Sequence, residues 1–404
     1  MNAEQKGRPS YLYHLNQSSI FRFIQSSGKI SRNQLARKTG LSIPTISRSL
    51  QNLENLGLVV SSGNRESGKK GGRPPQLFHF PATQNYAIGI DLEKETTSCI
   101  LADMSGKIRE SITMKTPDGA TVEDVSHMII RCIEEMQDKI PSQGRLRGIG
   151  LSVPGLVNRQ EGILTYSHTF GWKNIPLASL IRKKTHIPVF LDNEANLLSL
   201  GELCFGLGNR YKNFICVDIR YGIGCGIVYE NRLLDIPGEL GQICLDDLTQ
   251  VKKGMPRLTL EDRASDHAVL QKVETMRQQG ATSSLLSSYA RPVTLDKFRE
   301  ALVKNDQAAL KIFNQALSDL GIALAFLVNI FHPEAFIFHG PITENNPLFY
   351  SRLREVIDNC SLSPFAATLD LKPSCFQSIG GSVGAVAFVL HELLDLNPSF
   401  FTKS

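Results

Sequence analysis

Residues 31–56 carry two short helical patterns on either side of a glycine, and this pairing most constrains the fold of the chain. Ser31 followed by Gln34 has the form of a capping box, which predicts a first helix that ends at Gly40. Ser42 can cap a second helix that tolerates Pro44 in its first turn. Apolar residues recur along this second helix at steps of three and four, which predicts one buried face made of Ile43, Ile46, Leu50, Leu53 and Leu56.

The opposite face of the second helix is predicted to be polar, and we place Thr45, Ser47, Arg48, Ser49 and Asn52 there. Proteins of the helix-turn-helix type contact base edges mainly from the first turns of this helix. An amphipathic helical hairpin that packs on another protein is the structural alternative. The residues of this module that we predict to contact DNA are Ser31, Arg32, Ser42, Thr45, Ser47, Arg48 and Asn52.

A wing is predicted after the second helix. Residues 58–60 and 76–80 have the composition of two strands, and a loop rich in Ser, Gly, Lys and Arg joins them. Lys69, Lys70 and Arg73 make the loop basic, so Arg73 could enter a narrow minor groove, where the potential is most negative. The alternative for this loop is a solvated linker.

Charge is unevenly distributed along the chain. Residues 1–80 hold five Lys and seven Arg against three Glu, a net charge of +9, whereas the whole chain has a formal charge of +5. The remainder is therefore acidic. A basic first module is expected if that module neutralises DNA phosphates.

The composition is that of an ordinary globular protein of two or three domains, with 404 residues, 42% hydrophobic and 21% charged. We see no signal segment and no apolar run near the roughly 20 residues of a membrane span, which predicts a cytoplasmic protein with no membrane partner. The eight cysteines occur singly, without a CxxC pair, and are expected to be reduced, mostly core thiols.

From residue 86 onward, the sequence alternates between strand and helix patterns, which predicts an α/β architecture. A helix is expected over 122–137, and the expected strands lie within 86–92, 98–106, 148–155, 188–196, 213–220 and 224–230.

The chain resembles the ROK family of repressors, open reading frames and kinases. The matching motifs lie in order at 88–91, 153–157, 171–172, 192–196, 222–226 and 238–241. The resemblance implies an actin-like, ribonuclease-H-like two-lobed sugar kinase fold at 86–404, which would carry the effector pocket and the dimer contacts. It covers nearly the whole chain, because repressors of the family also carry an N-terminal winged helix, here predicted at 1–80.

Three segments that contact the nucleotide in kinases of the family are altered here. Glu93 and Lys94 lie in the turn where the kinases have glycines. Arg220 and Tyr221 replace a Gly-Thr, and the Gly-Gly after the late strand becomes His339-Gly340-Pro341. A Cβ blocks close approach to phosphate, and a carboxylate repels it.

The resemblance places Glu194 at the position of the kinase catalytic base, an aspartate. The extra methylene moves the carboxylate by about 1 Å, which can cost on the order of a hundredfold in rate. Together with the altered phosphate turns, this predicts an inactive kinase domain with no catalytic residue.

No metal and no cofactor are expected. The family's zinc is usually held by a histidine and a run of cysteines, whereas this chain has Gln242 at the histidine position and only Cys244 in the cysteine segment.

Sugar contacts are better preserved than phosphate contacts. The resemblance places a set of carboxylate, amide and imidazole side chains around a monosaccharide. The alternative for each is a solvated or core-capping polar group. The set is His168, Asn193, Glu194, Glu239, Gln242 and Glu261.

These observations predict a bacterial DNA-binding transcriptional regulator, a repressor of sugar-utilisation genes, which binds operator DNA as a homodimer or tetramer and is nucleoid-associated when bound. Its effector is a sugar or sugar derivative. Two alternatives stay open: a DNA-binding sugar kinase, and a regulator that a partner protein controls without a small ligand. The sugar and the operator sequence are not determined by the sequence.

Overall fold

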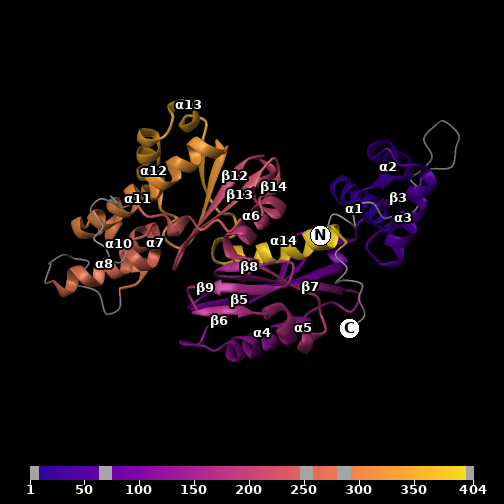
Figure 1. Ribbon diagram of the computed structural model, residues 1–404, viewed down its shortest axis with the longest axis horizontal. Helices are drawn as coiled ribbons and strands as arrows, with labels where there is room; N and C mark the ends of the chain where they lie inside the picture. The colour runs from indigo at the N-terminus through magenta and orange to yellow at the C-terminus, as the bar shows by residue number, and fades with distance from the viewer. Residues whose placement is uncertain (1–8, 63–74, 246–257, 280–292, 397–404) are drawn as a thin grey trace.

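The computed structural model describes residues 9–62, 75–245, 258–279 and 293–396. It places a small winged helix at one end of a two-lobed α/β body (Figure 1). The predicted wing residues Lys69, Lys70 and Arg73 lie outside the described residues.

The winged helix confirms the predicted helix-turn-helix. Ser31 and Gln34 form both bonds of the capping box of α2, and Gly40 ends this helix in the left-handed conformation, with φ of 70°. Ser42 caps α3 by accepting a hydrogen bond from the backbone of Thr45. The elements of this part are α1 (Pro9–Ser27), β1 (Ile30–Ser31), α2 (Arg32–Thr39), α3 (Ile43–Asn55), β2 (Val60–Ser62) and β3 (Leu77–His79), with strand order β1-β3-β2.

Two predictions about α3 are wrong. Ile43 is 42% exposed, although its spacing placed it on the buried face, and Ser49 is fully buried, although it was placed on the polar face. Helix α1 was not predicted, and it packs on both α2 and α3. This extra helix widens the buried surface of α3.

Lobe 1 is built on a five-stranded sheet with the order β11-β7-β4-β5-β6. One face of this sheet packs on α4 (Val122–Gln137) and α5 (Leu177–Thr185). The strands are β4 (Asn85–Leu92), β5 (Thr96–Asp103), β6 (Ile108–Lys115), β7 (Arg145–Val153) and β11 (Val189–Asn193), and a small side sheet holds β8 (Leu156–Asn158), β9 (Ile163–Ser167) and β10 (Trp172–Ile175).

Lobe 2 has a second five-stranded sheet with the order β14-β13-β12-β15-β16. Its strands are β12 (Phe214–Ile219), β13 (Ile223–Tyr229), β14 (Arg232–Leu233), β15 (Ala335–His339) and β16 (Asp370–Pro373). Its helices are α7 (Leu260–Ala264), α8 (Asp266–Gln278), α10 (Leu295–Val303), α11 (Gln307–Phe331), α12 (Pro347–Cys360) and α13 (Ser363–Ala366).

Two helices join the lobes. α14 (Gly380–Leu394) lies across the sheet of lobe 1, and α6 (Glu194–Phe205) packs along α14 and also against β12 and β13 (Figure 1). Each lobe therefore presents the ends of its strands to the same cleft.

The buried core does not end at the predicted domain boundary. Apolar residues of the winged helix belong to the same cluster as α14 and one face of the lobe 1 sheet. The division into domains at 1–80 and 86–404 stays a prediction.

Among the described residues, two segments are long and apolar enough to cross a membrane, α11 and the stretch Gln377–Leu394. They are 61% and 72% buried inside the protein, as is usual for core helices. Burial also corrects the expectation for the cysteines. All eight are free thiols, but only Cys99, Cys132, Cys216 and Cys225 are buried.

Candidate functional site

A pocket lies in the cleft between the lobes. The space within the pocket measures about 670 Å³, which includes space open to solvent. Lobe 1 contributes the turns after β4 and β7 and the start of α6, whereas lobe 2 contributes the β12–β13 turn, η4 (Leu240–Gln242) and α7.

The structure brings the six predicted sugar contacts together around this pocket. The lining includes His168, Asn193, Glu194, Glu239, Gln242 and Glu261. These residues come from distant parts of the chain, so their convergence was not contained in local sequence. Whether they contact a sugar stays a prediction.

Three of these side chains already have protein partners. The Asn193 amide accepts from the backbone N–H of Ala195 at 2.9 Å and donates to the Gly155 carbonyl at 3.0 Å, because Asn193 caps α6. Glu261 accepts from the backbone N–H of Ile223 at 3.3 Å, and Glu194 lies 3.5 Å from Arg220. Asn193 therefore has a structural role whether or not a sugar binds.

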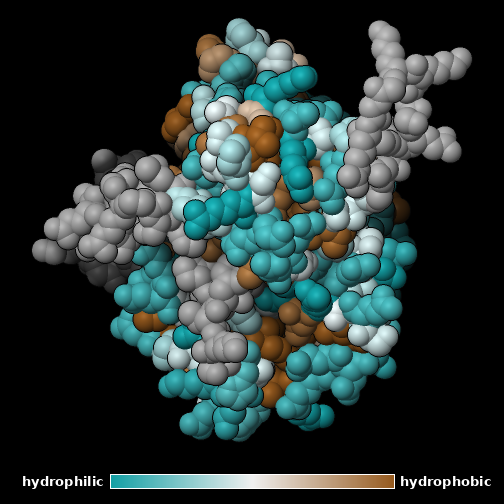
Figure 2. Space-filling view, turned by 90° about the vertical axis from the view of Figure 1, so that its right-hand side faces the viewer, coloured by the Kyte–Doolittle hydropathy of each residue, from teal (hydrophilic) through white to brown (hydrophobic). Residues whose placement is uncertain are grey.

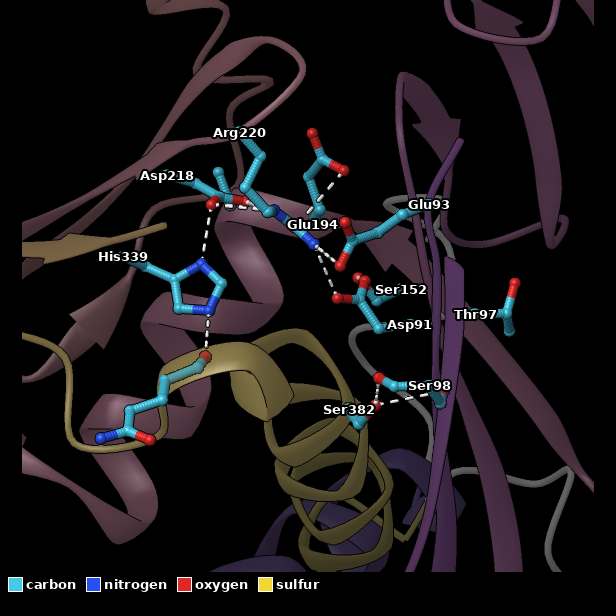
Figure 3. A network of polar contacts seen from close by, with 12 residues as sticks. Asp91, Glu93, Thr97, Ser98, Ser152, Glu194, Asp218, Arg220, His339 and Ser382 are labelled. Atoms are coloured by element: carbon cyan, nitrogen blue, oxygen red, sulfur yellow. Dashed lines mark hydrogen bonds and ion pairs between the residues drawn. The ribbon is translucent and has the colours of Figure 1, made fainter. Parts of the chain in front are cut away.

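Arg220 lies at the centre of an ionic network at the floor of the cleft (Figure 3). Its guanidinium is 2.9 Å from Asp91 and 2.7 Å from Asp218, and it also forms ion pairs with Glu93 and Glu194. The Arg220 side chain is only 11% exposed. Four carboxylates from both lobes thus surround one cation.

The network shifts the acidity of its members. Burial raises the pKa of Glu194 well above its usual range, against the opposing charge of Arg220. Burial likewise raises the pKa of Glu93, to about 7. Burial would also raise the pKa of Asp218, but Arg220 and His339 outweigh it and lower this pKa. Asp218 is therefore the strongest acid of the three, whereas Glu93 and Glu194 are protonated more easily than free glutamates.

His339 extends the network into lobe 2. Its Nδ1 lies 2.8 Å from Asp218, and its Nε2 contacts the Gln377 carbonyl. Burial would lower the pKa of this imidazole, but Asp218 outweighs burial and raises it. His339, one of the altered nucleotide positions, is therefore fixed by protein partners on both ring nitrogens.

Lys94 and Tyr221, the other altered positions, lie together at the rim. The ammonium of Lys94 donates to the Tyr221 hydroxyl at 2.6 Å, and the Tyr221 ring stacks on His267 at 4.3 Å. Lys94 and Arg220, two cations that line the pocket, are thus both engaged with protein groups.

The predicted absence of zinc concerns Gln242 and Cys244. In the described part of the chain, no group of three or more His, Cys, Asp or Glu side chains is arranged to hold a metal ion. Gln242 lines the pocket, and Cys244 is half-buried.

Sequence reasoning missed Asp91 and Asp218 as partners of Arg220. Both lie on a strand with buried apolar neighbours, in Ile90-Asp91 and Val217-Asp218. An ionised carboxylate in such a strand needs a partner, so the pattern could have indicated a buried ion pair.

The predicted DNA contacts on α3 and its cap differ in exposure. Arg48 and Ser42 are exposed, and Thr45, Ser47 and Asn52 are half-buried. Figure 2 views the molecule from the side that carries the winged helix, and hydrophilic residues cover most of that face.

The two predicted contacts at the start of α2 differ. Arg32 is exposed and donates to Gln76 at 3.2 Å. Ser31 is buried, and its hydroxyl is engaged with Gln34 in the capping box. The Ser31 side chain therefore has a structural role in the cap, and its contact with DNA stays a prediction.

Comparison with known proteins gives two matches along the chain. The sequence profile of the ROK family matches residues 87–392, and a profile described as winged helix-turn-helix DNA-binding matches residues 15–60. The xylose repressor of Caldicellulosiruptor bescii is 28% identical over 396 residues, which cover 96% of this chain and 98% of that protein.

Solved structures share the fold. A ROK family transcriptional regulator, described as a homologue of the E. coli MLC protein, superposes with a TM-score of 0.83 at 24% identity over 97% of this chain and all of that chain. A ROK family glucokinase from Streptomyces griseus, in complex with glucose and AMPPNP, gives 0.64 at 21% identity over 76% of this chain and 99% of that one.

Proposed function

The chain belongs to the ROK family, and from that premise we propose that it is a DNA-binding transcriptional regulator that represses sugar-utilisation genes. The observation that carries this proposal is one chain that joins a winged helix to a carboxylate-lined pocket in which four carboxyl groups hold Arg220. The xylose repressor, which matches over nearly its whole length, supports the same function.

The pocket is the site proposed for a sugar or sugar derivative. Glu239 and Glu261 offer carboxylate oxygens to hydroxyl groups, and burial raises the pKa of both. Glu239 lies in the pocket wall on the lobe 2 side, so a ligand that contacts both it and Asn193 would bridge the lobes. Such a ligand changes operator affinity only through unequal affinity for open and closed arrangements.

Phosphoryl transfer is not part of the proposed function. ATP would have to displace Arg220 from its four carboxyl partners and would then meet the negative charge of Asp218. We expect no ADP formation with a pentose, a hexose or an N-acetylated sugar. Sugar-dependent turnover that Glu194→Gln abolishes would show that the chain is a kinase.

The proposed setting is the bacterial cytoplasm, with association with the nucleoid when operator DNA is bound. A homodimer or tetramer would present paired recognition helices, which require half-sites about one helical turn, or a multiple of it, apart. Cross-linking with sedimentation would determine the oligomeric state.

The decisive test measures operator affinity by fluorescence anisotropy with D-xylose, D-glucose or N-acetyl-D-glucosamine. A sugar that binds by calorimetry should change the affinity, and Glu239→Ala should abolish this change while operator binding without sugar remains. Exposed Glu123 on α4 provides the matched control, as Glu123→Ala. If operator affinity did not change with any sugar that binds, the proposed sensing function would be contradicted.

A further inference from the structure

Arg147, on β7 of lobe 1, contacts the C-terminal end of α3, the predicted recognition helix. Its guanidinium donates to the carbonyl oxygens of Leu56, at 3.3 Å, and Gly57, at 2.8 Å. Leu56 is the C-cap of α3, where helix carbonyls lack intrahelical partners and a cation is favourable. Arg147 also donates to the side chain of Asn85 at 2.5 Å. A single forked side chain thus holds the end of α3 against β7.

The same strand leads to the pocket. β7 ends at Val153, and the following Pro154 and Gly155 line the pocket. Near this end, Ser152 donates to Asp91, the lobe 1 partner of Arg220, at 2.5 Å. β7 is paired on both sides, with β4 and β11, so it connects two points roughly 20 Å apart at ~3.3 Å per residue as part of a stiff sheet.

α14 makes a second connection of the same kind. At its start, Gly381 packs so closely on Asp91 that a Cβ would lie 2.2 Å from the carboxyl carbon. Just after its end, Asp395 forms an ion pair with Arg22 of α1 and accepts, through its backbone carbonyl, a hydrogen bond from Ser18 at 3.1 Å. β7 and α14 therefore each connect the ionic network with the winged helix.

We propose that Arg147 and the Arg22–Asp395 pair are the positioning contacts through which β7 and α14 set the placement of α3 relative to the lobes. In this assignment, which rests on the proposed function, a ligand that moves the Pro154-Gly155 turn or the Asp91 region shifts the recognition helix through these contacts. Neither arginine reads DNA or touches the ligand.

The test compares the Arg147→Gln, Arg22→Gln and double variants with the wild type, all as full-length proteins. Arg131→Gln is the matched control, because exposed Arg131 lies on α4 and loses the same charge. Calorimetry with D-xylose, D-glucose and N-acetyl-D-glucosamine measures the pocket, and fluorescence anisotropy measures operator affinity with each sugar that binds.

We expect sugar affinity in the variants to stay within about twofold of the wild type. The change in operator affinity on adding sugar, about 5- to 150-fold for a typical coupling, should fall below about twofold in the double variant. Arg147→Lys should be intermediate, because an ammonium keeps the charge but loses the forked geometry. If Arg147→Gln does not fold, Arg147→Lys and Arg22→Gln carry the test.

A full sugar response in the double variant would overturn the proposal. The proposal would also be overturned if operator affinity fell equally with and without sugar, so that the ratio of the two affinities stayed as in the wild type. That result is expected of a merely structural contact. A wild-type protein whose operator affinity ignores every bound sugar would instead overturn the proposed sensing function, and this coupling with it.

Discussion

Arg220 and Asp91 come from opposite lobes, and their side chains meet across the cleft, with Nη1 of Arg220 2.9 Å from Oδ2 of Asp91. Asp91 lies on β4 of lobe 1, and Arg220 follows β12 of lobe 2. The Asp91 side chain is fully buried, so a charged carboxylate there requires a partner. This pair ties the lobes together at the floor of the cleft.

Arg220→Ala should strongly destabilise the protein. Removing the cation leaves the buried carboxylates of Asp91 and Asp218 without their shared partner, and breaking a buried pair in this way costs about 3–5 kcal/mol. Urea denaturation followed by circular dichroism measures the loss, with the exposed Arg131→Ala as control. A loss below about 1 kcal/mol, as for a surface ion pair, would contradict the structural importance of the network.

Stability should depend on pH through Glu93. Burial raises the pKa of this glutamate from 4.5 to about 7, so the folded state binds the proton more tightly than the unfolded chain. The stabilisation is fully present below about pH 4.5 and is lost as the pH rises through about 7. At ~1.4 kcal/mol per pKa unit, the loss is at most about 3 kcal/mol.

The difference between wild type and Glu93→Gln isolates this effect from His339, whose pKa is also raised. Denaturation midpoints at several pH values should show a steeper decline for the wild type between pH ~4.5 and ~7 than for the variant. Parallel curves would show that Glu93 does not titrate in this range.

Gly381→Ala should be destabilising although it lies within α14. Alanine is favoured over glycine in a helix by about 1 kcal/mol. The added Cβ would, however, lie 2.2 Å from the carboxyl carbon of Asp91, which is held by Arg220 and cannot move freely. Overpacking of this kind costs about 1–3 kcal/mol, so the clash outweighs the propensity. A thermal midpoint above that of the wild type would contradict this reasoning.

Arg48→Ala should weaken specific operator binding. Arg48 is exposed on α3, and its guanidinium lies 5.7 Å from the ring centroid of Tyr13, which restricts its orientation. A base contact from such a side chain contributes about 1–3 kcal/mol. Competition with non-specific DNA in a gel shift tests this, and the exposed Arg131→Ala is the control. Equal losses on specific and non-specific DNA would mean that Arg48 contacts only phosphate.

The sequence by itself determined the helix-turn-helix. Ser31, Gly40 and Ser42 act on the backbone within four residues of themselves, so capping signals can be read without knowledge of the rest of the chain. The alternation of strands and helices could also be read from local patterns, whereas the residues of the pocket were named only through the resemblance to the ROK family.

Only the tertiary structure decided which of these residues have partners. Arg220 could be recognised as a bulky replacement, but Asp91 is 129 residues away, and no local pattern pairs the two. The same holds for Arg147, which reaches Gly57 from the next module. Burial and ion pairing depend on which surfaces meet after folding, and that information is spread over the whole chain.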